Sequence, residues 1–308
     1  MLGVLAARCH HNTKIPGDVV SDPIILGIGG ITIALESEIT ESAFDVPARF
    51  FDFYTNLRPD VRLSIHREFF HEWKDKSVRK IFDTGLSWSL FRNQFNWLLY
   101  VRSPSGNPYQ LGVFADNYHS GDIFVIESAR NPEYYNFPLG KPMGEIFMAN
   151  LLARGYGISM HACGVIYNGN GLLFTGTSGS GKSTIAKLWQ GLEGVKVVND
   201  DRVIIRLIDE KFWLYGTPWH GQGGMALPDA APLEKVFILK HGKKNEIQRL
   251  DIINATTALL VRSFAPLWDR DAMDFSLGLL GKLSGALPCY ELDFVPDRNA
   301  VEFVRCLN

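Results

Sequence analysis

The sequence predicts an α/β protein in which a larger carboxy-terminal α/β domain is preceded by a smaller β-rich domain. In the first half, short strand-like runs alternate with turn residues. In the second half, an apolar strand leads through a glycine-rich loop into a helix. Between the halves lies a Pro- and Gly-rich stretch, Asn136–Gly144, which is typical of a linker. With 308 residues, the chain is long enough for two domains.

Composition and charge exclude several classes of partner. Hydrophobic residues make up 46% of the chain, charged residues 21%, and the formal net charge is −2, so no global field attracts nucleic acid. The short basic stretch Lys240–Lys244 is better explained as a solvated turn. No apolar run approaches the roughly 18 residues of a membrane-spanning helix. The 4 cysteines are scattered without C-x-x-C pairs, as in reducing compartments. We therefore expect a cytoplasmic protein with neither a nucleic-acid nor a membrane partner.

The amino-terminal half is expected to contain a flexible arm and a β-rich accessory domain. Residues 1–22 form the arm, and its Cys9-His10-His11 triplet suggests a disordered tail more than a metal site, because no partner ligands lie nearby. Residues 23–140 form the accessory domain, which opens with the glycine-interrupted β-branched run Ile24–Leu35. Further strands are expected at Arg62–Phe69, Trp97–Arg102, Leu111–Ala115 and Asp122–Glu127. This half contains no recognisable catalytic constellation.

The carboxy-terminal half, residues 145–308, is expected to alternate strands and helices. Its central feature is a hairpin, because Asn-Gly pairs tolerate the positive φ angles of a tight turn. The expected elements are helix Glu145–Arg154, strand Ile158–Tyr167, turn Asn168–Gly171, strand Leu172–Thr175, helix Lys182–Gln190, strand Phe212–Tyr215 and helix Asp297–Cys306.

A phosphate-binding loop follows the strand that ends at Thr175. Its sequence is Gly176-Thr177-Ser178-Gly179-Ser180-Gly181-Lys182-Ser183, with Thr184 next in the helix. The glycines allow successive backbone N–H groups to face phosphates, and the helix N-terminus adds its dipole. Lys182 is expected to reach the β- and γ-phosphates, and the Ser183 hydroxyl to bind Mg²⁺. Residues 176–184 therefore predict a site for ATP, or another nucleoside triphosphate, with Mg²⁺.

Two adjacent carboxylates, Asp200 and Asp201, end a buried-strand pattern that begins at Val195. A metal–nucleotide site needs a carboxylate near Mg²⁺, and phosphorylation of a hydroxyl benefits from a second carboxylate that accepts the proton. Adjacent strand residues point to opposite faces, so the two should differ in role. The other interpretation is that both are turn or helix-capping acids.

Two further features are ambiguous from the residues alone. His161 lies on the strand before the P-loop strand, where a lone histidine is usually structural. It shares a strand face with Cys163, but two ligands do not make a metal site. The glycine-dense segment Gly216–Gly224 either shapes the mouth of a substrate site or is a plain connection.

The block Met160–Ser183, together with Val198–Asp201, resembles the HPr kinase/phosphorylase family. These proteins are related to phosphoenolpyruvate carboxykinases and carry a P-loop in a β-rich α/β fold. The resemblance covers roughly residues 145–240. It implies that Asp200 is a general base with His161 as its electrostatic partner, and that Ser183 and Asp201 serve the metal.

The amino-terminal half is loosely similar to extended relatives from gene clusters for modified peptides, some of which phosphorylate a peptide serine. The second signature of HPr kinases, an acidic-glycine stretch, is not recognisable, and Gly216–Gly224 stands in its region. HPr itself is therefore not implied as the substrate.

These observations predict a kinase that transfers the γ-phosphoryl group of a nucleoside triphosphate to a hydroxyl. Serine is the favoured acceptor, on a peptide, small protein or metabolite, and Asp200, His161 and Lys182 are the predicted catalytic residues. The alternative is a nucleotide-binding regulator or ATPase in which Asp200 only orders water. Homo-oligomerisation stays open.

Overall fold

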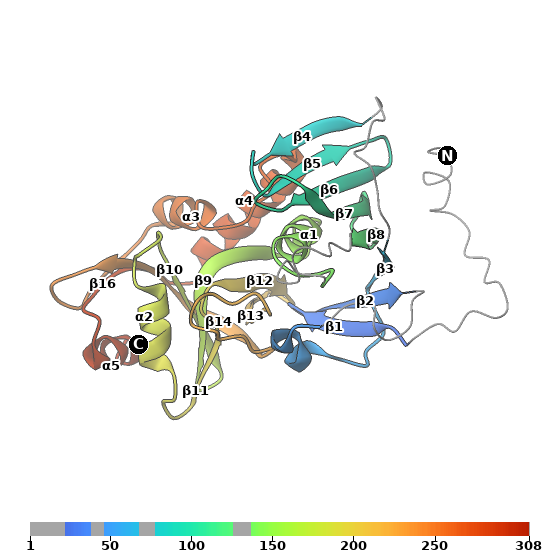
Figure 1. Ribbon diagram of the computed structural model, residues 1–308. Coiled ribbons are helices and arrows are strands. Elements are labelled where there is room, and N and C mark those ends of the chain that lie inside the picture. The colour runs from blue at the N-terminus through green and yellow to red at the C-terminus, as the bar shows by residue number, and fades with distance from the viewer. Residues whose placement is uncertain (1–21, 38–45, 68–77, 126–136, 308) are drawn as a thin grey trace, which may run out of the picture.

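The computed structural model describes residues 22–37, 46–67, 78–125 and 137–307. Within these ranges the chain forms two eight-stranded sheets and five α-helices, which confirms the expected α/β class in its coarse form. Figure 1 shows the first sheet, blue to green, beside the second, yellow-green to red, with helix α1 between them. The Cys9-His10-His11 triplet of the predicted arm lies outside the described residues.

The first sheet contains the strands expected in the amino-terminal half and two that were not expected, β4 and β5. Its order is β1-β2-β3-β8-β7-β6-β5-β4. The run Ile24–Leu35 is a hairpin of β1 and β2, because Gly29 and Gly30 between them have φ of 62° and 69°. A 3₁₀-helix at Ala48–Phe53 was also not predicted. The strands are β1 (Ile24–Ile28), β2 (Ile31–Ser37), β3 (Val61–Arg67), β4 (Arg79–Asp83), β5 (Trp88–Arg92), β6 (Asn96–Arg102), β7 (Pro108–Ala115) and β8 (Ser120–Val125).

The second sheet is built around β10, which pairs antiparallel with β9 and parallel with β14. The predicted Asn-Gly turn joins β9 to β10, with φ of 50° at Asn168 and 84° at Gly169. Strand β9 also pairs with β11 and with β12. The strands are β9 (Ile158–Tyr167), β10 (Asn170–Thr175), β11 (Val195–Asn199), β12 (Arg202–Ile208), β13 (Lys211–Tyr215), β14 (Ala230–His241), β15 (Glu246–Arg249) and β16 (Cys289–Phe294).

Helices cover both faces of the second sheet, so its central strand is buried on both sides. Successive side chains of a strand point to opposite faces, and in β10 both Leu173 and Phe174 are fully buried. Leu173 packs in a core with α3 and α4, whereas Phe174 packs in a core with α2 and α5. The helices are α1 (Met143–Leu152), α2 (Lys182–Trp189), α3 (Ile252–Leu260), α4 (Arg270–Ala286) and α5 (Arg298–Arg305).

Helix α1 joins the two halves of the molecule. Its residues Met143 and Phe147 belong to the core of the first sheet, and the ring centroids of Phe147 and Phe114 are 5.0 Å apart. The same core includes Trp219, whose indole N–H donates a hydrogen bond of 2.9 Å to the Leu139 carbonyl. The core thus continues across the predicted boundary at residues 140–145, and the division into two domains stays a prediction. Among the described residues, no helix is both long and apolar enough to cross a membrane.

Candidate nucleotide-binding site

The P-loop leaves the buried strand β10 and ends in helix α2, as the sequence predicted. Gly179 and Gly181 have φ of 79° and 98°, a region that disfavours residues with a Cβ atom. A Cβ on Gly181 would lie 2.5 Å from the Phe294 ring, and one on Gly176 would lie 2.2 Å from Ser180 Oγ. Conformation or packing therefore requires glycine at these positions.

Several loop residues are exposed to solvent, and the buried Lys182 contacts the loop backbone. Thr177, Ser178 and Gly179 are exposed, whereas Lys182 is buried. The Lys182 ammonium donates hydrogen bonds of 2.9 Å and 3.1 Å to the carbonyl oxygens of Gly176 and Thr177. Burial lowers the pKa of Lys182, and the nearby charge of Asp201 opposes that shift. No atom lies within 4 Å of a Cβ built on Gly179, so this side of the loop is open to a phosphate chain.

The oxygen groups at the loop fit a magnesium ion carried by a nucleotide. Ser183 is exposed in the first turn of α2, Thr184 follows it half-buried, and the Asp201 side chain is 19% exposed. Hydroxyl and carboxylate oxygens are the ligands that Mg²⁺ prefers, and with nucleotides it takes few from the protein. Among the described residues, no group of three or more His, Cys, Asp and Glu side chains could hold a metal by itself.

Asp201 lies among cations in the turn between β11 and β12. The Asn199 side chain shapes this turn by accepting hydrogen bonds of 2.7 Å from the backbone N–H groups of Asp201 and Arg202. His161 Nδ1 lies 3.0 Å from one Asp201 carboxylate oxygen, and Lys141 Nζ lies 3.5 Å from the other. Burial would raise the pKa of Asp201, but the His161 hydrogen bond and the charges of Arg202 and Lys141 hold it well below its usual value. Asp201 is therefore kept ionised.

Asp200 is held in a different way, beneath the glycine-dense loop. The residue is 2% exposed, and its two carboxylate oxygens accept hydrogen bonds of 3.0 Å and 2.7 Å from the N–H groups of Gly221 and Gly223. A Cβ on Gly223 would lie 2.6 Å from the carboxylate. The segment Gly216–Gly224 is thus more than a plain connection, because it covers one of the two paired acids.

The contact made by His161 differs from the one that the family resemblance implied. His161 bonds to Asp201, whereas Asp200 turns toward the glycines. The β9–β12 register explains this: His161 pairs with Arg202, and the Ala162 N–H donates to the Asp201 carbonyl at 3.0 Å. The direct contact of His161 is therefore with Asp201 and not with Asp200. Strand β11 also ends at Asn199, so the different environments of the two acids arise from a turn and not from strand alternation.

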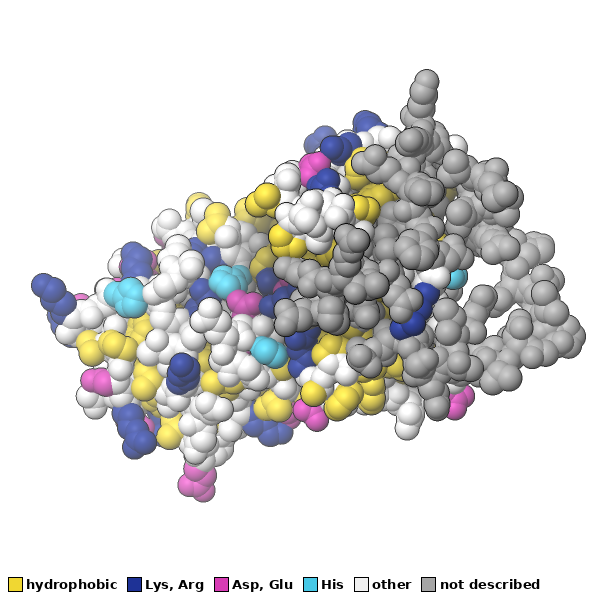
Figure 2. Space-filling view, viewed as in Figure 1, with side chains coloured by type: hydrophobic (Ala, Val, Ile, Leu, Met, Phe, Trp, Pro, Cys, Tyr) yellow, Lys and Arg dark blue, Asp and Glu magenta, His cyan; other side chains and the backbone are white. Residues whose placement is uncertain are grey.

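The site also contains residues that the sequence analysis did not single out. Lys141 and Glu145 come from the segment before α1 and from α1 itself, and Glu145 forms a 2.8 Å ion pair with Arg202. The carbonyl of Arg262, just after α3, accepts a 2.8 Å hydrogen bond from the His161 N–H. Of these residues, only Arg202 could have been expected at the site from the sequence, because it directly follows the two acids. Figure 2 shows histidine, basic and acidic side chains close together near the middle of the visible face.

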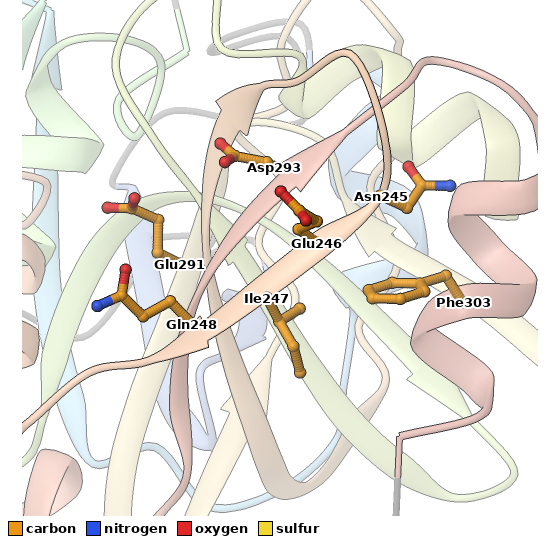
Figure 3. A pocket seen from close by; sticks show the side chains of 7 residues that line it. All are labelled: Asn245, Glu246, Ile247, Gln248, Glu291, Asp293 and Phe303. Carbon is orange, nitrogen blue, oxygen red and sulfur yellow. The ribbon is translucent and has the colours of Figure 1, made fainter.

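A pocket of about 530 Å³ lies between β15, β16 and α5. Figure 3 shows its lining side chains, which are Asn245, Glu246, Ile247, Gln248, Glu291, Asp293 and Phe303. Glu246 pairs with Lys244, and Glu291 with Lys240 at 2.6 Å. The lining contains neither a P-loop residue nor either of the paired aspartates.

Comparisons with known proteins add little to this geometry. No family model matches the chain, and no curated protein matches it. Among solved structures, the chain is similar to an Hpr(Ser) kinase/phosphatase from Coxiella burnetii, with 14% sequence identity and a TM-score of 0.28. The match covers 48% of this chain and 95% of that chain. A likeness of this size decides nothing about function, which we argue from the residues of this chain.

The charges around Asp201 predict how the free energy of unfolding depends on pH. Asp201→Asn should lower the free energy of unfolding at pH 7 by about 1–2 kcal/mol, because a partly exposed charged hydrogen bond is lost. The folded pKa of Asp201 lies below the usual 3.8, so its contribution is complete above about pH 5 and disappears as the pH falls through the folded value. Urea unfolding at pH 7, 5 and 3 measures this. Asp274→Asn, at a side chain that is 72% exposed, is the control, and a pH-independent difference for Asp201→Asn would contradict the assignment.

Proposed function

We propose that this chain is a kinase that transfers the γ-phosphoryl group of ATP, or another nucleoside triphosphate, to a hydroxyl group. The strongest support is that the P-loop lysine and two carboxylates in different environments lie at the same end of the second sheet. Thr175, the last residue before the loop, donates a 2.8 Å hydrogen bond to the His161 carbonyl, and the His161 ring reaches Asp201. Lys182 and Asp201 are close enough to influence each other electrostatically.

The binding roles follow from charge and geometry. The loop N–H groups and the α2 N-terminus would hold the phosphates, and Lys182 would leave its loop carbonyls for the β- and γ-phosphate oxygens. Ser183 and Asp201 would hold Mg²⁺ between them and the nucleotide, where it neutralises charge on the phosphates. For this, the ion pair between Asp201 and Lys141, whose ammonium is 3.5 Å away, must weaken.

Asp200 is the better candidate for the general base. A carboxylate whose pKa is held well below its usual value, as at Asp201, is a weak proton acceptor. Asp200 has no ion pair among the described residues, and its carboxylate accepts hydrogen bonds from two backbone N–H groups. In the proposed reaction the acceptor oxygen bonds to the γ-phosphorus, the bond from that phosphorus to the bridging oxygen breaks, and Asp200 takes the hydroxyl proton. This requires the segment Gly221–Gly223 to move aside when the acceptor binds.

Replacing Lys182 tests the nucleotide site. Lys182→Ala should weaken binding of MgATP by about 10–100-fold, the equivalent of one charge-assisted hydrogen bond, and weaken MgADP less. Calorimetry with both nucleotides gives the two ratios. Lys187→Ala, at an exposed position on the same helix, should change neither affinity. Unchanged affinities in Lys182→Ala would remove the assignment of the P-loop.

The reaction itself is tested by following the label of γ-labelled ATP. With host extract and the purified chain, the label should appear on a protein or metabolite in a bond that resists mild acid, as a serine phosphate does. If all of the label appears as inorganic phosphate, the chain is an ATPase and the kinase proposal is wrong. The Asp200→Asn variant should label the acceptor far more slowly than wild type does.

A further inference from the structure

Lys141 connects the proposed metal-binding acid to the glycine-dense segment. Its ammonium group donates a hydrogen bond of 3.0 Å to the carbonyl oxygen of His220, and it lies 3.5 Å from one carboxylate oxygen of Asp201. The lysine stands just before α1, in the stretch that leads from the first sheet to the second. One half-buried cation therefore contacts two parts of the site that are far apart in sequence.

The backbone that Lys141 contacts belongs to a short flap, His220–Gly224, which covers Asp200. The N–H groups of Gly221 and Gly223 donate to the two Asp200 carboxylate oxygens at 3.0 Å and 2.7 Å. The flap is thus held from below by a carboxylate and at its first residue by the Lys141 ammonium. An acceptor hydroxyl can reach Asp200 only after these contacts weaken.

The flap lies between two fixed points. Trp219, directly before it, is 1% exposed, and its indole N–H donates to the Leu139 carbonyl at 2.9 Å. Met225, directly after it, is also buried. The five residues between them are half-buried or exposed, and three are glycines. Few apolar contacts and a flexible backbone favour local opening, so the flap can move while its ends stay in place.

A second acid offers Lys141 another position. A carboxylate oxygen of Glu145, in α1, lies 3.5 Å from the ammonium, the same distance as the Asp201 oxygen. Glu145 is also paired with Arg202 at 2.8 Å, which keeps its carboxylate at the site. Mg²⁺ at Asp201 would place a divalent charge beside the ammonium, and the repulsion would favour the position near Glu145.

We propose that Lys141 is a positioning residue that keeps the flap closed over Asp200 until Mg²⁺ and nucleotide bind at Asp201. This rests on the proposed kinase function and adds an order of binding to it. The metal and nucleotide bind first, Lys141 moves from Asp201 and the His220 carbonyl toward Glu145, and the flap then opens to the acceptor. Lys141 and Mg²⁺ compete for Asp201, so loss of the lysine should strengthen metal binding, whereas damage to the site would weaken it.

Lys141→Met tests this, because methionine keeps much of the side-chain length and removes the charge. In protein saturated with ADP, the Mg²⁺ concentration at half-saturation should fall by about 2–5-fold, the size expected for a partly exposed ion pair. Hydrogen exchange of the Gly221 and Gly223 amides, followed by mass spectrometry, is a readout that does not depend on activity. In wild type, MgADP should speed this exchange by about 3–10-fold, the equivalent of one hydrogen bond. In Lys141→Met the exchange should be fast without MgADP and should not respond to it.

Three further variants complete the experiment. Lys141→Arg keeps the charge and should keep the response of the flap to MgADP. Lys211→Met makes the same change as the test variant at an exposed lysine and should behave as wild type. Thermal melting checks that each variant is folded, and Lys141→Ala replaces Lys141→Met if the latter is not.

The outcomes separate this proposal from the proposed function. If wild type binds MgADP but Lys141→Met needs as much Mg²⁺ as wild type, or more, the Lys141 assignment is overturned and the kinase proposal stands. A flap that responds to MgADP equally in wild type and in Lys141→Met, or that does not respond in wild type, overturns it as well. If wild type binds neither MgADP nor MgATP, both proposals are overturned.

Discussion

Asp200→Asn is expected to bind MgATP as wild type does and to transfer the phosphoryl group about 10²–10⁴-fold more slowly, the usual cost of losing a general base. Asparagine can still accept one hydrogen bond from Gly221 or Gly223, so the loop should stay closed over the site. Binding by calorimetry and single-turnover transfer must be measured on one preparation, because a misfolded variant would imitate the loss of rate.

Asp201→Asn is the matched comparison, because it makes the same chemical change one residue away. It should raise the Mg²⁺ concentration at half-maximal activity, since a carboxylate near the metal is lost. If Asp200→Asn transfers at the wild-type rate while Asp201→Asn loses transfer at saturating Mg²⁺, the two roles are reversed and Asp201 is the base.

The His161 contact decides how these effects combine. Because His161 bonds to Asp201, His161→Ala and Asp201→Asn should be strongly non-additive, and the double variant should be little worse than the more damaging single one. The rate losses of His161→Ala and Asp200→Asn should instead multiply, since these two described side chains do not contact each other. Multiplication in both pairs would mean that the histidine is structural.

The parts of the site that could be predicted from sequence are those whose signals are local. The Asn168-Gly169 turn, strand β10, the P-loop and α2 are continuous in sequence, and each is determined by turn chemistry, apolar runs or a glycine pattern. Which charged groups surround Asp201 depends on sheet register and on the packing of α1. Neither produces a recognisable sequence pattern near Lys141 or Arg262, so the place of these residues in the site is visible only in the structure.

Helices α3 and α4 escaped prediction for a different reason. Helix α4 contains Gly278, Gly281 and Gly285, and each glycine costs about 1 kcal/mol relative to alanine in a helix. Helix α3 begins with two isoleucines and includes two threonines, all of which are β-branched and favour strands. Tertiary packing outweighs these local preferences, because Leu259 and Leu283 are fully buried in the core under β10.

Gly181→Ala is expected to lower the affinity for MgATP by about 10²–10⁴-fold, corresponding to two lost charge-assisted hydrogen bonds from loop N–H groups. Gly181 combines a φ of 98° with a position against Phe294, so a methyl group there is strained and also meets the ring at 2.5 Å. The loop must shift to relieve both, and its N–H groups then no longer converge on the phosphates.

Two further variants separate strain from steric contact. Gly179→Ala has a similar φ of 79° but no atom within 4 Å of the new methyl group, so it should pay only the backbone cost of about 1–2 kcal/mol. Gly181→Ala combined with Phe294→Leu should recover part of the affinity, because the smaller leucine side chain leaves space for the new methyl group. Calorimetry with MgATP gives all three values. Equal losses in Gly179→Ala and Gly181→Ala, with no recovery in the double variant, would show that contact with Phe294 does not shape the loop, and strain alone would then explain the glycines.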